Sequence, residues 1–245
     1  MATIWMPDAA PTSAGSEDDE FHDSSLSALW AEVDHGGTLT ASEDELGLKL
    51  LMTTHTTHGF AGIYKAIPSG DFTIWTKASV NCIRGTTGVP FTVIDHACAG
   101  LALWEDGTSA TGDVTFFCIE WNLDSNVSNF RAWITVYDAT AYDAAATTTQ
   151  VGEAGQDVWP SHAYLRIRRT GTTYAFDFSG DGVAWQRLHS GTLAFTPTHF
   201  GPAVENRYRM AGADMAGRFA FFRYVASDVG IAGTVGGRSV SVTPL

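Results

Sequence analysis

The chain has 245 residues, of which 44% are hydrophobic and 12% aromatic, with 25 glycines and a net charge of −13. This composition is typical of a large β-sheet core with many tight turns, and it disfavours nucleic-acid binding because a phosphate-contacting surface needs concentrated positive charge. No apolar stretch approaches the roughly 20 residues of a membrane helix, and residues 1–13 lack the basic and apolar regions of a signal peptide. The sequence therefore predicts no membrane partner and no secretion through a signal peptide.

The negative charge is concentrated at the N-terminal end of the chain. Residues 1–48 hold 11 acidic residues and no Lys or Arg, which leaves 16 acidic and 14 basic residues for the rest. The run Glu-Asp-Asp-Glu at residues 17–20 is typical of a solvated linker, and a cation site or an arm that docks on a basic neighbour are the alternatives. We therefore predict an acidic N-terminal arm over residues 1–19.

Short strand-like segments follow, separated by turns rich in Gly, Asp and Asn. Their spacing of 8–12 residues indicates an all-β sandwich, with a loop rather than a helix over residues 139–149. We expect strands at about residues 47–54, 61–67, 71–80, 91–105, 113–122, 130–138, 164–169, 173–178, 184–188, 192–195, 199–205 and 217–226.

The most specific pattern is YLRIRRTGTTYAFDFSGDGVAWQRL, residues 164–188. Alternating apolar residues on either side of Gly-containing turns predict a meander of tight hairpins, because such turns require positive φ. Asp181 and Gly182 are expected to form the second turn, and Trp185, which follows it, to pack in the core between two sheets.

This order of residues resembles the meander of concanavalin A-like lectin/glucanase jelly rolls, the laminin-G-like branch included. The pattern from Phe21 to Trp30 resembles the entry strand of the same family, in which both aromatic residues anchor the first strand in the core. The resemblance implies an antiparallel two-sheet β-sandwich over residues 20–226, followed by a Gly-, Ser- and Val-rich tail over residues 227–245.

That fold hosts many glycanases, which need two closely placed carboxylates. The β-glucanase branch places them in an E-x-D-x-x-E or E-x-D-x-E run on one strand, and no such run occurs here. The nearest strand acid is Glu120, and the next carboxylate, Asp124, lies beyond the expected strand end. We therefore predict no enzymatic activity, with a glycoside hydrolase as the less favoured alternative. No cofactor is expected; calcium is left open by the excess of acidic residues.

Two expected strands carry aromatic and Arg residues on the side opposite their apolar residues. This side is a candidate face for stacking sugar rings or for a subunit interface, while coverage by the protein's own loops is the third possibility. The residues of this predicted face are Arg131, Trp133, Tyr137, Tyr164, Arg166 and Arg168.

Three cysteines, Cys82, Cys98 and Cys118, cannot all pair within one chain, so buried free thiols and assembly in a reducing cytoplasm are expected. Concanavalin A-like domains recur among bacteriophage decoration, fibre and tail proteins. The resemblance therefore implies a non-enzymatic structural or decoration protein of a virion, with host glycans as a candidate ligand. Its two arms are expected to bind other subunits in a homo-oligomer. A soluble carbohydrate-binding module is the alternative.

Overall fold

The computed structural model describes residues 17–35, 39–53, 59–84, 94–106, 113–123, 130–140, 147–158, 162–206 and 213–226. The predicted tail and most of the predicted N-terminal arm lie outside these residues. Nowhere in the described ranges is there a helix long and apolar enough to cross a membrane. The described residues form fourteen strands: β1 (Ala31–His35), β2 (Leu39–Asp44), β3 (Gly47–Met52), β4 (Gly59–Ala66), β5 (Phe72–Arg84), β6 (Ile94–Trp104), β7 (Val114–Leu123), β8 (Phe130–Thr140), β9 (Thr147–Val158), β10 (Ala163–Thr170), β11 (Thr173–Ser179), β12 (Gln186–Thr192), β13 (His199–Asn206) and β14 (Ala213–Ala226).

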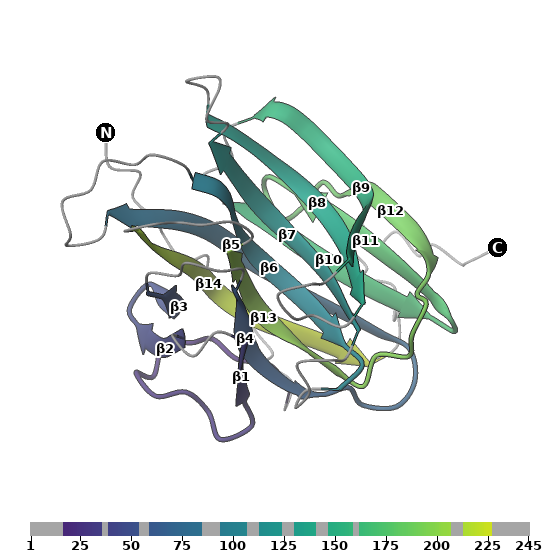
Figure 1. The fold of residues 1–245 in the computed structure, drawn as a ribbon. Coiled ribbons are helices and arrows are strands. Elements are labelled where there is room, and N and C mark those ends of the chain that lie inside the picture. The colour runs from purple at the N-terminus through teal and green to yellow at the C-terminus, as the bar shows by residue number, and fades with distance from the viewer. Residues whose placement is uncertain are drawn as a thin grey trace, which may run out of the picture.

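The strands form two seven-stranded sheets. The first sheet has the order β1-β4-β13-β6-β7-β8-β9, and the second sheet has the order β12-β11-β10-β5-β14-β3-β2. Every paired strand runs antiparallel to its neighbour. Figure 1 shows the long strands β6 to β9 side by side in one layer. This confirms the predicted antiparallel two-sheet sandwich.

The core lies between the sheets and follows the alternation of each strand. Leu101 of the first sheet and Leu165 and Ile167 of the second sheet are fully buried in it. The register of β14 shifts between Phe219 and Phe222, so that both rings enter the same core although they are three positions apart. A bulge of this kind moves the intervening residues to the other face of the sheet.

The N-terminal segment differs from the prediction in two ways. Residues 20–30 form no strand; instead, Asp19 makes an isolated antiparallel bridge with Phe222 of β14. Phe21 and Trp30 are both buried in the core, with ring centroids 5.9 Å apart. The run at residues 17–20 is also no solvated linker, because Glu17 pairs with the buried side chain of Lys65.

Three other expectations need correction. The loop predicted over residues 139–149 holds the end of β8 and the start of β9, and the strand predicted at residues 192–195 is absent because β12 ends at Thr192. β1, β2 and β9 were not predicted as strands.

Candidate functional site

The six residues of the predicted ligand face divide between the two sheets. Tyr164, Arg166 and Arg168 lie on β10 of the second sheet, whereas the other three lie on β8 of the first sheet. The side chains of Arg131, Trp133 and Tyr137 are outside the described part of the structure. The described site is therefore built from β10 and its neighbours β11 and β12.

The outer face of these strands carries a cluster of three arginines around one carboxylate, which we call the arginine cluster. Asp177 Oδ2 accepts hydrogen bonds from Arg166 Nη2 at 3.1 Å and from Arg168 Nε at 2.9 Å, and Oδ1 accepts from Arg187 Nε. The register of the strands brings the arginines together: Arg166 of β10 and Arg187 of β12 both lie directly opposite Asp177, which is on the strand between them, β11. Burial raises the pKa of Asp177, but the hydrogen bond from Arg187 and the charges of the arginines outweigh it and hold the pKa below its usual value.

Trp185 covers one edge of this cluster. The Arg166 guanidinium lies 4.0 Å from the centroid of the Trp185 ring, which is a close cation–π contact. Trp185 is half-buried and packs against Tyr164 and Phe221, on the side of the second sheet that faces away from the core. The prediction that Trp185 packs between the sheets is therefore wrong, because the β11–β12 turn returns the chain over the outer face.

The turn before Trp185 is held by two polar side chains. Asp181 Oδ1 accepts hydrogen bonds from the backbone N–H groups of Val183 and Ala184 at 2.8 and 2.9 Å, and these bonds lower the pKa of the Asp181 carboxyl. Ser179 Oγ accepts from the N–H of Gly182 at 2.9 Å. Gly182 has a φ of 75°, and a side chain there would press against the Tyr164 ring.

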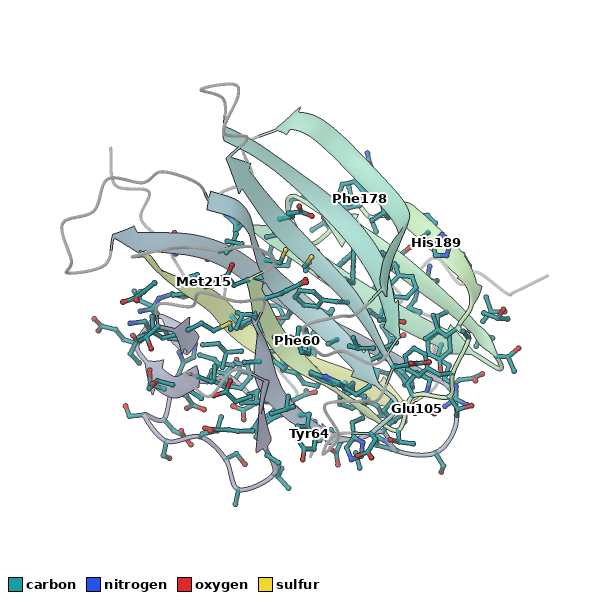
Figure 2. The ribbon with its side chains drawn as sticks, viewed as in Figure 1. Phe60, Tyr64, Glu105, Phe178, His189 and Met215 are labelled. Atoms are coloured by element: carbon teal, nitrogen blue, oxygen red, sulfur yellow. The ribbon has the colours of Figure 1, made fainter. Side chains whose placement is uncertain are left out.

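A shallow pocket of about 330 Å³ opens beside this turn. Phe178, at the end of β11, forms one wall, and its position is labelled in Figure 2. An aromatic ring next to short polar side chains is the combination that binds a sugar, because the apolar face of the sugar stacks on the ring while its hydroxyls are hydrogen-bonded. The lining residues are Phe178, Ser179, Gly180, Asp181, Ala184, Trp185 and Gln186.

The outer face of the first sheet holds a pair of carboxylates that the sequence pattern did not reveal. Glu205 of β13 and Glu120 of β7 both pair with Cys98 of β6, one from each side. Both glutamate side chains are 0% exposed. Burial, the neighbouring Cys118 and then the two glutamates raise the pKa of the Cys98 thiol.

This pair comes from strands that are far apart in sequence, so a search for two acids on one strand could not find it. The available signal was a single acidic residue inside a mostly apolar strand, which occurs in both β7 and β13. Two strand spacings place their backbones roughly 9–10 Å apart. Cys98 and Cys118 are buried free thiols, as predicted, while the side chain of Cys82 is outside the described part. No group of three or more His, Cys, Asp or Glu in the described ranges is arranged to hold a metal ion.

No protein-family model matches the sequence, and no curated protein sequence matches it. Solved structures do match. The GH43 protein BlXynB from Bacillus licheniformis has a TM-score of 0.55 and 12% identity over 86% of this chain and 39% of that chain. Xylan β-1,4-xylosidase from Bacillus halodurans C-125 has a TM-score of 0.52 and 15% identity over 89% and 40%, respectively. The Emp47p carbohydrate recognition domain has a TM-score of 0.52 and 8% identity over 89% and 100%.

At these identities the likeness shows the fold alone. The fold is the concanavalin A-like jelly roll that the sequence motifs indicated. The chain spans about two fifths of the length of the two bacterial proteins and the full length of the Emp47p domain. The fold thus defines the class as a concanavalin A-like antiparallel β-sandwich domain.

Proposed function

We propose that the chain is a non-enzymatic carbohydrate-binding domain that serves as a structural or decorating part of a virion. The observation that carries the binding proposal is the half-buried Trp185, held by Arg166 and placed in the wall of an open pocket with polar side chains. The fold shared with a carbohydrate recognition domain agrees with this proposal.

In this proposal Trp185 provides the surface on which a sugar ring stacks. The Arg166 guanidinium at 4.0 Å fixes the ring in one orientation, so little side-chain freedom is lost on binding. Ser179 and Asp181 are already ordered by the turn, and Gln186 supplies an amide that both donates and accepts hydrogen bonds. A site of this kind recognises one or two sugar units rather than a long chain, because the pocket measures only about 330 Å³.

The test is glycan binding by the full chain on an array, followed by calorimetric titration of the best ligand. Trp185→Ala and Gln186→Ala should each lower the affinity at least tenfold. Trp75→Ala is the matched control, because Trp75 packs in the same outer cluster but does not line the pocket. Equal affinities for the Trp185 and Trp75 variants would place the sugar elsewhere.

The Glu120–Glu205 pair favours a second candidate, a glycoside hydrolase. Inverting enzymes of this class hold their two carboxyl groups roughly 6.5–9.5 Å apart. Glu120 and Glu205 lie on the two strands that flank β6, and the separation of roughly 9–10 Å between their backbones is close to this range. Full burial of both side chains argues against it, because a substrate must reach the catalytic carboxylates. A panel of aryl glycosides decides the matter: turnover by the wild type that disappears in Glu120→Gln would establish the hydrolase.

The virion role is supported by the family resemblance of the sequence motifs and by the two buried reduced thiols, which fit assembly in a host cytoplasm. Immunoelectron microscopy of purified particles with antibodies against the chain should label the particle surface. Unlabelled particles that also lack the chain by mass spectrometry would exclude this role and leave a free carbohydrate-binding module.

A further inference from the structure

Residues 17–21, which we call the acidic segment, lie along β14 in the position of an additional strand. β3 pairs with β14 from Met215 to Phe219, and beyond that point the acidic segment takes its place. Asp19 and Phe222 exchange two backbone hydrogen bonds of 2.9 and 2.7 Å, and the N–H of Tyr224 donates to Asp18 Oδ1 at 2.7 Å. The segment therefore occupies a strand-addition site.

This site is lined with positive charge. Lys65 of β4 and Arg223 of β14 are both buried. Glu17 Oε2 lies 3.3 Å from Lys65 Nζ, and Glu20 and Asp18 both pair with the Arg223 guanidinium. Burial lowers the pKa of the Lys65 ammonium, and the charge of Glu17 opposes that shift. Since a buried charge without a partner is strongly unfavourable, the site requires an acidic strand.

Aromatic rings complete the recognition. Lys65 Nζ lies 4.7 Å from the Trp30 ring centroid and 4.9 Å from that of Phe222. The Phe21 side chain is fully buried beside Trp30. We call Lys65, Trp30, Phe222, Arg223 and Tyr224 the acceptor groove; it matches an acidic strand that ends in an aromatic residue.

The chain that connects the acidic segment to the sandwich is exposed and strained. His22, Asp23, Ser24 and Ser25 are exposed, and the backbone adopts φ values of 54° at Phe21 and 67° at Ser24. Non-glycine residues rarely adopt such values, and they are held there by the contacts on either side. A short connection under strain favours exchange of the segment it carries with another copy of the same protein.

We propose that the acceptor groove also takes the acidic segment of a second copy, so that two copies exchange residues 17–21 and form a symmetric dimer. Exchange keeps every contact of the groove, because each copy supplies an identical segment, and it releases the strained connection. The exchange site lies on the β14 edge and does not include the pocket beside Trp185, so its test is independent of glycan binding.

The contact between Glu17 and Lys65 allows a direct test with the full chain. Equal amounts of ¹⁴N- and ¹⁵N-labelled protein are unfolded, refolded together and treated with a carbodiimide, which joins a carboxylate and an amine that touch. Mass spectrometry then reads the isotopes of the joined Glu17–Lys65 peptides. Peptides that combine both isotopes are expected, and Glu17→Gln should abolish them. A cross-link between Asp44 and Lys49 of the β2–β3 hairpin is the internal control and should carry one isotope only.

Cross-linked Glu17–Lys65 peptides of a single isotope, together with a monomeric mass by light scattering at every concentration, would overturn the proposal. A hinge variant adds a second criterion. Ser24→Gly removes the strain at that position, because glycine adopts positive φ freely, and it should lower the share of mixed-isotope peptides relative to the neighbouring control Ser25→Gly. An equal share in both variants contradicts the strained hinge on which the exchange depends.

Discussion

Replacing Asp177 by Asn tests whether one buried carboxylate holds the outer face of the second sheet together. The change keeps the shape of the side chain but leaves three guanidinium groups around a neutral amide. Asp177 is 2% exposed, whereas the side chains of Arg166, Arg168 and Arg187 are 13, 27 and 43% exposed. Removing one partner of a fully buried pair costs about 3–5 kcal/mol. Because two of the arginines reach solvent, which screens their charge, we expect a loss of about 2–3 kcal/mol.

Urea unfolding followed by tryptophan fluorescence measures this loss as a shift of the midpoint by roughly 1 M. The depressed pKa of Asp177 means that its contribution is present above the ordinary carboxyl pKa and is lost as the pH falls through the folded-state pKa. The difference between wild type and Asp177→Asn should therefore be full at neutral pH and shrink in acid. Asp71→Asn is the control, because Asp71 accepts an exposed hydrogen bond from Gly171 N. A midpoint shift no larger than that of the control, and constant with pH, would refute the reasoning.

Three further changes test the packing and the charges. Trp185→Ala should destabilise less than Phe222→Ala, about 1–2 against 3–5 kcal/mol in urea unfolding, because only Phe222 is fully buried between the sheets. Gly100→Ala should prevent folding, as judged by circular dichroism, because its Cβ would meet the backbone of Phe117 on the neighbouring strand. Burial, and next the nearby carboxylates, raise the pKa of the Glu43 carboxyl to about 8. The folded state therefore binds this proton more tightly than the unfolded state does, and the stabilisation that protonation provides is lost as the pH rises toward 8. Glu43→Gln should therefore gain stability relative to wild type between about pH 5 and pH 9, measured by urea unfolding at both values.

The interior strands could be predicted from sequence, whereas three of the four edge strands could not. β5, β6, β7 and β10 read as alternating apolar runs because one face of each packs in the core. β1, β2 and β9 were missed, and all three are edge strands of the two sheets. An edge strand has one neighbour and little to bury, so its sequence is polar or charged, as in TTTQVGEAGQDV of β9. The periodicity that identifies a strand is absent there for a physical reason.

The site was harder to predict than the fold because it depends on which strands share a face. The alternation of β10 correctly separated Leu165 and Ile167 from Arg166 and Arg168. It could not show that β8 belongs to the other sheet. In the same way, nothing in the order of residues indicates that Trp185 folds back over the outer face. Tertiary connections of this kind are set by the path of the turns and not by local pattern.

The net charge of the chain bears on which sugars the proposed site would select. After residue 48 the chain has 14 basic and 16 acidic residues. Among the described residues of this part, the buried bases Lys65, Lys77 and Arg223 are matched by the buried acids Glu120, Asp177 and Glu205, so burial does not change the charge balance. A sulfated or uronic-acid glycan would approach a chain whose net charge is −13, except directly over the arginine cluster, where Asp177 already offsets part of the positive charge. A neutral sugar meets no such penalty and needs only the ring of Trp185 and the polar groups of the turn.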